Sequence, residues 1–323
     1  MRAGVVIVAG GKGTRMGAGE EKLLLPLGGV PLLVRTLLPF QACSEIGEIV
    51  LVASPGLAER IRKEILPSGR LDKIARIVSG GKRRQDSAYQ GLRAFSRGPG
   101  IVLIHDGDRP FVTEDLIRAV IRSAAGGGAL AAVRAKDTIK LQGRGSAVEK
   151  TLDRKRIWLA QTPQGFPYRA ILAAHEQARA EKWEATDDAE IMERAGGRVK
   201  IVAADYDNIK IATPEDYDLA LLIQARRRLF RPRSPGSRNR WGSTFPGNGW
   251  KAIGWSGGGS SISNPTTVRL PWRYKTGRTA PPSTWGCSRE KSWFFFSGRP
   301  RATRPGPSCP IWRRSTAVGR ERG

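Results

Sequence analysis

A loop near the N-terminus combines glycines with cationic side chains. It follows an apolar, strand-like run at residues 5–8 and contains, in order, Gly10, Gly11, Gly13, Arg15 and, a little further on, Lys22. Glycine lets the backbone approach a ligand oxygen closely, and cations complement the charge of a phosphate chain. The pattern therefore indicates a phosphate-binding loop, with a plain turn from strand to helix as the alternative.

Two common nucleotide-binding loops are excluded by the spacing. The dinucleotide pattern G-x-G-x-x-G needs a third glycine where Met16 stands, and the G-x-x-x-x-G-K-[ST] pattern of P-loop ATPases is absent. If the loop binds phosphate, it does so with neither of these two spacings.

A carboxylate and a second glycine turn follow later strand-like segments. Asp106 comes directly after the apolar run 101–105, where a carboxylate can hold Mg²⁺ together with phosphate oxygens. The alternative is a carboxylate that caps a turn or pairs with Arg109. The stretch 79–87 contains a second glycine turn with Gly81, followed by Ser87 at an expected helix start. Helix N-termini bind anions, and the alternative is that Ser or Asp there caps the helix.

These residues require a layered fold to position them. Residues 1–230 alternate strand-like and helix-like segments, which predicts an α/β domain. Strands are expected at 5–8, 49–53, 74–78, 101–105, 129–134, 157–161 and 199–203. Helices are expected at 30–41, 57–65, 85–95, 114–124, 168–181, 187–194 and 214–228. Ligands bind beyond the carboxyl ends of strands in such sheets, so the loops 9–17, 79–87 and 105–110 should converge on one crevice.

A hairpin is expected within an arm at about 136–156. Residues 138–141 and 147–151 flank a Gly-Arg-Gly turn, and the arm has little apolar content. A two-stranded hairpin is marginally stable alone, so the arm needs a partner surface.

Residues 231–323 differ from the rest of the chain. They hold 18 of the 55 Lys and Arg residues but two of the 29 Asp and Glu residues, so +16 of the net charge of +26 lies here, with seven of the nine tryptophans. One interpretation is a basic tail that binds polyanions nonspecifically, although disordered segments are usually poor in aromatics. Another is a nucleic-acid-binding protein that stacks tryptophan on bases. Our preferred hypothesis is that this segment is a GC-rich gene translated out of frame.

The spacing of the cysteines and the length of the apolar runs indicate in which cellular compartment the protein resides. Cys43, Cys287 and Cys309 are widely spaced and form no Cys-x-x-Cys pair, so neither a disulfide framework nor a zinc site is indicated. The N-terminus has no signal-peptide pattern, and no run of 18 apolar residues occurs. We expect a reduced, cytoplasmic protein that does not enter the membrane.

Taken together, the glycine loop and five later motifs resemble the 2-C-methyl-D-erythritol 4-phosphate cytidylyltransferase family over about residues 3–228. The motifs are Ala9-Gly10-Gly11-x-Gly13-Thr14-Arg15-Met16, Gly80-Gly81-x-x-Arg84-x-x-Ser87, His105-Asp106-x-x-Arg109-Pro110, Thr151-Leu152-Asp153-Arg154 followed by residues 158–166, Ala185-Thr186-Asp187-Asp188, and Asp207-Asn208-Ile209-Lys210. The resemblance implies a Rossmann-like three-layer α/β sandwich with a mostly parallel mixed sheet and a protruding β-arm. It also implies transfer of CMP from CTP to methylerythritol phosphate by in-line attack on the α-phosphorus. The nearest alternative is a nucleotidyltransferase for another sugar or polyol phosphate.

The resemblance implies a role for each matching position. The catalytic cations would be Arg15, Lys22 and Lys210, and the Mg²⁺ ligand would be Asp106. The nucleotide would be bound by Ala9, Gly10, Gly11, Gly13, Gly81, Asp86 and Ser87. The acceptor would be bound by Arg109, Arg154, Thr162 and Thr186. Arg154 would reach the acceptor of a neighbouring subunit, which implies a homodimer formed through the arm.

The chain departs from the usual pattern of the family at two places. Glu21 and Leu23 flank Lys22 where the family usually has proline and glutamine. Gly107 and Asp108 stand where it usually has two alanines. An extra carboxylate beside the metal ligand would either attract a second cation or repel the triphosphate.

Overall fold

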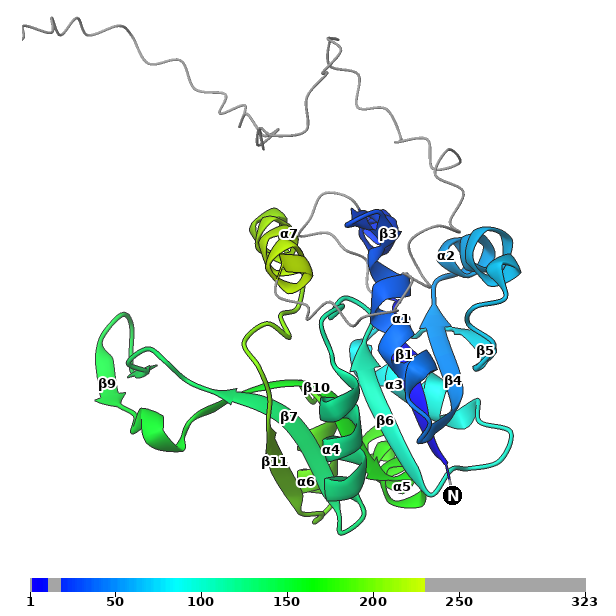
Figure 1. Ribbon diagram of the computed structural model, residues 1–323. Helices are drawn as coiled ribbons and strands as arrows, with labels where there is room; N and C mark the ends of the chain where they lie inside the picture. Colours follow the sequence, from blue (N-terminus) through cyan, green and yellow to red (C-terminus); the bar gives the residue numbers. More distant parts are fainter. Residues whose placement is uncertain (1, 11–18, 230–323) are drawn as a thin grey trace, which may run out of the picture. The chain divides into compact units, whose positions relative to one another are not determined.

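A seven-stranded sheet organises the computed structural model, which describes residues 2–10 and 19–229 (Figure 1). The strands lie in the order β11-β7-β10-β6-β1-β4-β5. Their bounds are β1 (Ala3–Val8), β4 (Ile46–Ala53), β5 (Ile74–Ser79), β6 (Ile101–Asp106), β7 (Gly128–Arg134), β10 (Trp158–Pro167) and β11 (Val199–Ala203). β10 pairs antiparallel with β6 and β7, whereas the other neighbours pair in parallel. The expected mixed, mostly parallel sheet is confirmed.

The central strands are apolar on both faces because helices cover both sides of the sheet. Val5, Val6 and Ile7 of β1 have no exposed surface, as expected for a parallel strand inside such a sheet. In the pairing register, Val8 lies opposite Val52 of β4 and Asp106 of β6. The carboxyl ends of three central strands therefore lie at the same edge, where their loops begin.

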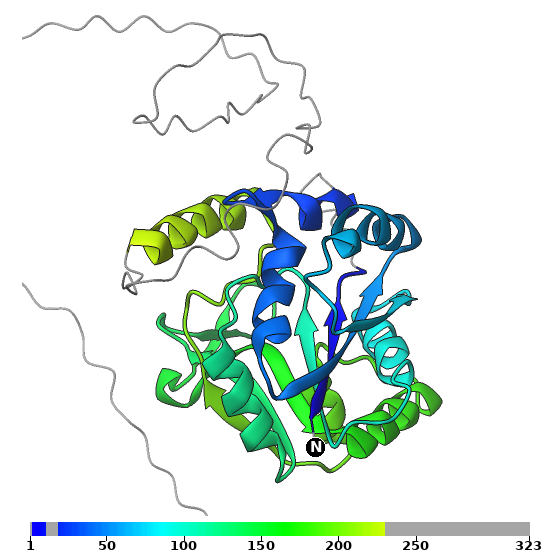
Figure 2. The same cartoon turned by 45° about the vertical axis from the view of Figure 1, so that its right-hand side comes forward.

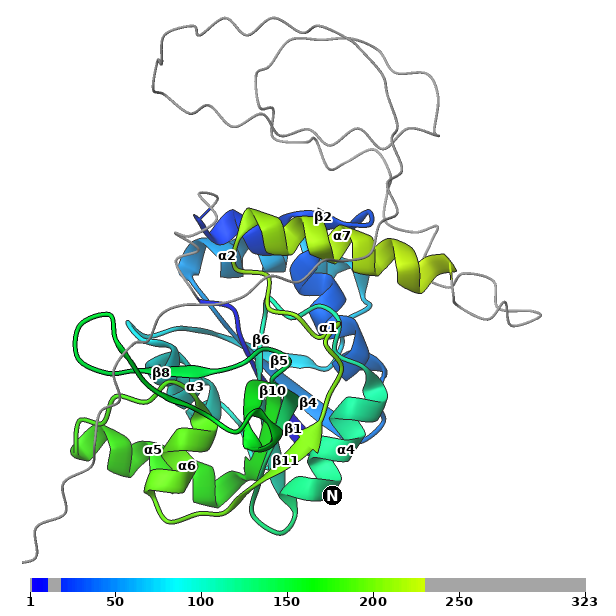
Figure 3. The same cartoon turned by 90° about the vertical axis from the view of Figure 1, so that its left-hand side faces the viewer.

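The helices form two layers, seen on either side of the sheet in Figure 3. One hydrophobic cluster contains side chains of α1 (Leu32–Ala42), α2 (Pro55–Arg60), α4 (Glu114–Ala124) and α7 (Pro214–Leu229). The other contains side chains of α3 (Arg84–Arg93), α5 (Tyr168–Ala180) and α6 (Asp188–Arg194). In Figure 2, α1 and α4 lie side by side, blue and blue-green, on the first face.

Capping side chains stand at the starts of two of the expected helices. The Oγ1 atom of Thr113 accepts the backbone N–H of Leu116 at 3.3 Å, and Asp187 accepts that of Glu190 at 2.8 Å. Such caps satisfy N–H groups that have no partner within the helix. The structure thus begins α4 at the expected residue, Glu114, and α6 one residue after the expected start at 187.

Three elements differ from their expected form. The helix expected at 30–41 begins at Leu32, because residues 30–31 form β3 (Val30–Pro31), which pairs with β2 (Pro26–Leu27) after the 3₁₀ helix η2 (Gly19–Leu24). The helix expected at 57–65 is divided into α2 and a π-helical segment, η3 (Ile61–Ile65), with a 3₁₀ turn, η4 (Leu66–Ser68), behind it. β10 continues six residues past 161 to Pro167, because Pro163 lies at the irregularity where pairing skips from Ala160 to Gln164, a place in a strand that tolerates proline.

The expected hairpin is present and projects from the sheet (Figure 1). β8 (Lys140–Gln142) pairs antiparallel with β9 (Val148–Thr151), and every residue of both strands is exposed. A 3₁₀ turn, η5 (Arg154–Arg156), leads back to β10. No helix in the described ranges is long and apolar enough to cross a bilayer.

Candidate active site

Asp106 ends β6 and is surrounded by three cationic side chains. Its Oδ1 lies 3.1 Å from Arg84 Nε, and its Oδ2 lies 3.0 Å from Lys210 Nζ and 3.4 Å from Arg109 Nε. These cations come from the start of α3, from the loop before α7 and from the loop after β6. Asp106 is only 6% exposed. Elements far apart in the sequence thus meet at one carboxylate.

The charges at this carboxylate outweigh its burial. Burial alone would raise the pKa of the Asp106 carboxyl, but Arg84, Lys210 and Arg109 lower that pKa well below its ordinary value. Asp106 therefore stays ionised at neutral pH. Because three cations face one carboxylate, the surroundings favour a further anion.

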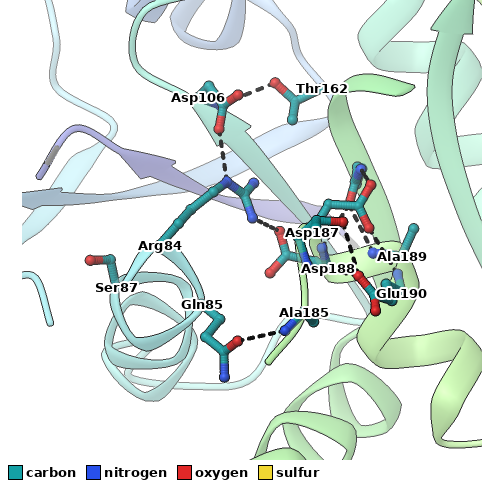
Figure 4. Close-up of polar contacts among 12 residues, drawn as sticks. Arg84, Gln85, Ser87, Asp106, Thr162, Ala185, Asp187, Asp188, Ala189 and Glu190 are labelled. Atoms are coloured by element: carbon teal, nitrogen blue, oxygen red, sulfur yellow. Dashed lines mark hydrogen bonds and ion pairs between the residues drawn. The ribbon is translucent and has the colours of Figure 1, made fainter. Parts of the chain in front are cut away.

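Arg84 joins Asp106 to a second buried carboxylate (Figure 4). Its Nη1 lies 2.8 Å from Oδ2 of Asp188, which has no exposed surface and whose Oδ1 accepts the Nε2–H of His175 at 3.1 Å. Burial would lower the pKa of the Arg84 guanidinium, but Asp188 and Asp106 raise it above its ordinary value. Arg84 stays charged and thereby links α3 to both β6 and α6.

Gln164 of β10 holds the first turn of α6. Its Oε1 accepts the backbone N–H groups of Asp188 and Ala189 at 3.1 and 2.9 Å, and its Nε2 donates to Oδ2 of Asp187 at 2.8 Å. Two N–H groups that lack partners inside the helix are satisfied in this way. The loop that precedes α6 and carries Thr186 is therefore anchored to the sheet.

His105 and Thr162 hold the backbone of Asp106 through a chain of hydrogen bonds. Its Nε2 lies 3.2 Å from the carbonyl oxygen of Arg109, so Nε2 carries the hydrogen, and its Nδ1 lies 3.0 Å from Oγ1 of Thr162. The same Oγ1 accepts the backbone N–H of Asp106 at 3.1 Å. Burial lowers the pKa of His105 to about 3, so the imidazole is neutral. It packs against Phe40 and does not line the cavity described next.

A polar cavity of about 250 Å³ opens beside Asp106. Its lining residues are Arg84, Asp106, Arg109, Ala160, Gln161, Thr162, Gln164, Thr186, Asp187 and Lys210. Five of these are residues that the sequence singles out, namely Asp106, Arg109, Thr162, Thr186 and Lys210. The structure brings those five together, and their individual roles remain predictions.

The glycine turn after β5 lies beside the end of β1. A Cβ atom on Gly10 would be 3.8 Å from both the Cα of Gly80 and the Oγ of Ser87. The N–H of Gly81 donates to that Oγ at 3.1 Å, and a Cβ on Gly81 would come within 2.4 Å of Asp86. The turn is therefore too tight for any residue with a side chain at 81. Ala9 is buried, and its N–H donates to Val52 O at 2.7 Å.

Asp86 has a local structural role in this structure. Its Oδ2 accepts the backbone N–H of Arg83 at 3.2 Å, and its two oxygens lie 3.0 and 3.1 Å from the Arg83 guanidinium. This contact caps α3, which was the alternative interpretation of an acidic residue at a helix start. A role in nucleotide binding remains a prediction.

Lys22 does not line the cavity. Its Nζ donates to Oδ2 of Asp108 at 2.8 Å and to the carbonyl oxygen of Ile211 at 3.2 Å. Both side chains of this ion pair are 11% exposed. Arg15, Gly11 and Gly13 lie outside the described residues.

Thr186 lines the cavity beside Asp106, whereas Arg154 does not. Thr186 is exposed, and its N–H and Oγ1 donate to Oε2 of Glu190 at 2.7 and 2.9 Å. Arg154 is exposed on η5, and its Nη1 donates to the carbonyl oxygen of Lys136 at 2.8 Å. Arg154 lines a separate cavity of about 340 Å³ at the base of the arm rather than the one beside Asp106.

Sequence reasoning assigned no role to several residues that build the site. Arg84, Gln164 and Asn208 all stand inside the quoted motifs. Asn208 is buried, and its Nδ2 donates to Gln161 Oε1 and to the backbone oxygen of Thr162 at 2.9 Å each. The backbone carbonyl oxygen of Asn208 accepts Nη1–H of Arg109 at 2.9 Å. The positions of these three residues inside the motifs were the available signal. Within the ranges the structure describes, no group of three or more His, Cys, Asp or Glu side chains could hold a metal alone.

Comparison with known proteins finds close relatives. Residues 3–226 match the family described as IspD, 2-C-methyl-D-erythritol 4-phosphate cytidylyltransferase. The protein of that name from Pelotomaculum thermopropionicum is 44% identical over 228 residues, which cover 70% of this chain and 96% of the relative. The one from Geobacillus kaustophilus is 46% identical over 224 residues, which cover 69% and 96%.

Solved structures share the fold. The crystal structure of 4-diphosphocytidyl-2C-methyl-D-erythritol synthase from Anaerococcus prevotii is 33% identical, with a TM-score of 0.63, and the match covers 70% of this chain and 99% of that one. The crystal structure of 2-C-methyl-D-erythritol 4-phosphate cytidylyltransferase from Thermus thermophilus is 31% identical, with a TM-score of 0.55, and the match covers 68% and 98%.

Proposed function

The chain belongs to the 2-C-methyl-D-erythritol 4-phosphate cytidylyltransferase family, and we propose that the cavity beside Asp106 is where it transfers CMP from CTP to 2-C-methyl-D-erythritol 4-phosphate. The products are 4-diphosphocytidyl-2-C-methyl-D-erythritol and pyrophosphate. The observation that carries this assignment is the gathering of Arg84, Arg109 and Lys210 around one buried carboxylate at the carboxyl edge of the sheet.

The chemistry needs positioning and charge more than a base. The acceptor phosphate is an anion at neutral pH, so its oxygen attacks the α-phosphorus of CTP without prior deprotonation. The new P–O bond forms as the bond from the α-phosphorus to the bridging oxygen breaks, and pyrophosphate leaves with that electron pair. Catalysis of this kind consists of alignment and stabilisation of charge on the phosphoryl oxygens.

The lining residues divide into two groups in this proposal. Lys210 binds the α-phosphate, and Arg109 with Thr162 and Thr186 binds the acceptor phosphate. Support comes from their common cavity and from the fixed orientation of Arg109, whose Nη1 donates to Asn208 O at 2.9 Å. Lys22 and Arg15 bind the triphosphate and stabilise the charge that develops at its α-phosphorus.

The cytidine lies against the glycine turn in this proposal. The backbone of Ala9, Gly10 and Gly11 contacts it from one side, and the turn that contains Gly81, Asp86 and Ser87 contacts it from the other. Support comes from the proximity of Gly10 to Ser87. Only a backbone without bulky side chains leaves room for a base at this point.

Asp106 is the residue that would hold Mg²⁺. Mg²⁺ in phosphoryl-transfer sites is commonly bound by one or two carboxylates and completes its shell with water and phosphate oxygens. A single ionised carboxylate that faces the cavity fits an ion shared with a triphosphate, and the lack of a three-ligand cluster among the described residues argues against a metal held by protein alone. When bound, the ion neutralises charge on the triphosphate.

A homodimer formed through the arm is the assembly we propose. The arm is exposed along both strands, including Val148, which is 59% exposed. Leu159 of β10 and Ile201 of β11 are each 48% exposed. These exposed apolar side chains support the assembly together with the need of a two-stranded hairpin for a partner surface. Arg154 of one subunit would then reach the acceptor bound to the other, and we place the reaction in the cytoplasm.

The domain division is also part of the proposal. Residues 1–230 form the nucleotidyltransferase domain, and residues 231–323, which lie outside the described residues, add no second activity. Support comes from the family match, which ends at residue 226. Sequencing the gene across codon 230 checks this, and an uninterrupted frame with ordinary codon usage to the end would contradict the out-of-frame explanation.

Pyrophosphate release by the purified protein tests the function. We expect release that requires CTP, methylerythritol phosphate and Mg²⁺ together, and little release with ATP, GTP or UTP. Release that is equally fast with another nucleotide or another sugar phosphate would replace the proposed substrates. A chain that ends at Phe230 should turn over at the same rate as the full chain.

A further inference from the structure

Asp108 is a buried carboxylate for which the proposed mechanism has no use. It lies two residues beyond Asp106 in the loop after β6, is 8% exposed and does not line the cavity. Its Oδ2 is 2.8 Å from Nζ of Lys22, a residue that the proposed function assigns to the triphosphate. The phosphate-binding lysine is therefore already paired with an anion of the protein.

The second oxygen of Asp108 faces another lysine. Oδ1 lies 4.0 Å from Nζ of Lys210, which at the same time contacts Oδ2 of Asp106 at 3.0 Å. Among the described residues this buried Oδ1 accepts no hydrogen bond. A buried oxygen without a donor is rare in folded proteins and marks a group that is incompletely satisfied. Asp108 thus stands between two of the cations proposed to bind CTP.

The backbone fixes Asp108, whereas the lysine can move. The N–H of Gly107 donates to Val8 O at 2.8 Å, and Oγ1 of Thr36 donates to Gly107 O at 2.9 Å. The carbonyl oxygen of Asp108 accepts the N–H of Ile211 at 2.9 Å. Lys22, by contrast, carries its ammonium on four methylene groups and donates to acceptors in any of several geometries. If one partner of this ion pair changes position, it is Lys22.

We propose that Asp108 occupies, in the nucleotide-free protein, the place of a phosphate group as the partner of Lys22, and that CTP draws Lys22 away from it. The inference rests on the proposed function and deepens it by adding a residue that sets nucleotide affinity. Carboxylate and phosphate oxygens both accept from an ammonium, so the two anions compete for the same donor. Asp108 then keeps a buried lysine paired before the nucleotide arrives, at the expense of affinity for CTP.

Titration calorimetry with CTP and Mg²⁺ tests the proposal on the full-length protein. The Asp108→Asn variant keeps the shape of the side chain and removes its charge. We expect it to bind CTP about tenfold more tightly than the wild type, the effect of removing one competing charge pair. In a Lys22→Gln background the same change should alter the dissociation constant less than twofold, because the lysine that Asp108 contacts at 2.8 Å is absent and Lys210, at 4.0 Å, lies beyond hydrogen-bond distance.

Two controls separate this effect from simpler ones. Asp205→Asn removes an exposed charge from the loop that carries Lys210 without touching Lys22, and it should leave the CTP affinity within twofold of the wild type. Asp108→Glu restores the carboxylate and should bind CTP more weakly than Asp108→Asn does. It also serves as the comparison if Asp108→Asn folds poorly, which thermal unfolding reports.

Several outcomes overturn the proposal. Unchanged or weaker binding by Asp108→Asn would show that Asp108 does not compete. Equal tightening in the Lys22→Gln background would indicate a general charge effect, and weakening that depends on the Mg²⁺ concentration would make Asp108 a metal ligand. Failure of the proposed function is a separate result, because it would appear as wild-type protein that binds CTP without forming product or that does not bind CTP.

Discussion

Arg84 and Arg154 stand in opposite surroundings. Arg84 reaches two buried carboxylates, Asp106 and Asp188, and its side chain is 25% exposed. Arg154 lies on the exposed arm, where its Nη1 donates to the carbonyl oxygen of Lys136. The first region, which we call the Asp106 network, is ordered by residues of a single chain. The second, the arm, has no ion pair of this kind among the described residues, and both of its strands are exposed.

The difference determines how each region responds to change. In the Asp106 network the charges are removed from water, so losing one partner leaves another charge buried without compensation. On the arm, water and salt screen the charges, so removing one affects the ligand it binds and little else. Substitutions in the two regions should therefore differ in the property they change, stability or ligand binding, as well as in the size of the effect.

Asp106→Asn should have the largest effect. It removes the charge at the centre of the network and the expected Mg²⁺ ligand, so kcat/KM should fall by about 10²–10³-fold, the loss typical of one electrostatic element in a site. The measurement is pyrophosphate release with saturating CTP. Asp115→Asn, which removes an exposed carboxylate on α4, is the control and should be fully active. Activity near wild type in Asp106→Asn would remove Asp106 from the mechanism.

Arg84→Met should have the next largest effect, and it should be on folding. The change leaves Asp188, which has no exposed surface, with His175 as its remaining side-chain partner among the described residues. Removing one partner of a buried pair costs about 3 kcal/mol, which lowers Tm by roughly 6–12 °C for a domain of this size. Arg83→Met is the matched control, because Arg83 is its exposed neighbour and pairs with Asp86 at the surface. Equal loss of Tm in the two variants would contradict the comparison.

Much of the fold could be predicted because its signals are local. The helix expected at 214–228 is observed at Pro214–Leu229, and the helix expected at 114–124 is observed at Glu114–Ala124 with Thr113 as its cap. The extension of β10 could not be predicted, because Pro163 and Gly165 usually end a strand and are tolerated here only by an irregular pairing with β7. The short strands β2 and β3 have two residues each and give no periodic signal.

The site could be predicted less completely because its contacts join distant residues. Residues at the ends of neighbouring strands were expected to converge, and Asp106, Arg109 and Lys210 do line one cavity. The partners of the cations could not be foreseen. Arg84 and Asp188 are 104 positions apart, and Lys22 and Asp108 are 86 apart. No periodicity or spacing in a sequence encodes such a pairing.

Burial of the neutral His105 imidazole should make the free energy of unfolding depend on pH. Burial lowers its pKa to about 3 in the folded state from about 6.5 in the unfolded state, so the unfolded chain binds the additional proton between these values. This contribution to stability is therefore complete above pH 6.5 and decreases as pH falls, by about 2 kcal/mol between pH 7 and pH 5. Denaturant unfolding at these two pH values measures it.

The control for this prediction is a His105→Gln variant. Its stability should fall less between pH 7 and pH 5, because no imidazole is left to take up the proton. The lowered pKa values of Asp106 and Asp188 do not interfere, because their contributions are lost only below the ordinary carboxyl pKa of about 4. An equal decrease in both proteins would assign the pH dependence to another group.

Arg154→Gln on the arm should have the smallest effect, and it should be confined to the acceptor. We expect KM for methylerythritol phosphate to rise about tenfold, the loss of one charge-assisted contact, with unchanged KM for CTP and unchanged Tm. Lys150→Gln, which removes an exposed charge from β9, is the control and should alter neither KM. A fall in Tm, or a rise in KM for CTP, would show that the arm belongs to the Asp106 network after all.

Mixing two defective proteins decides whether the acceptor site is shared between subunits. Asp106→Asn has a defective cavity but an intact arm, and Arg154→Gln has the reverse. If the site is shared as proposed, the cavity of the Arg154→Gln subunit in a mixed dimer receives Arg154 from its partner, so one complete site is restored. Random exchange makes about half of the dimers mixed, with one of two sites complete, so about a quarter of wild-type activity should return at low acceptor concentration. Activity that equals the average of the two separate proteins would instead mean that Arg154 serves its own chain.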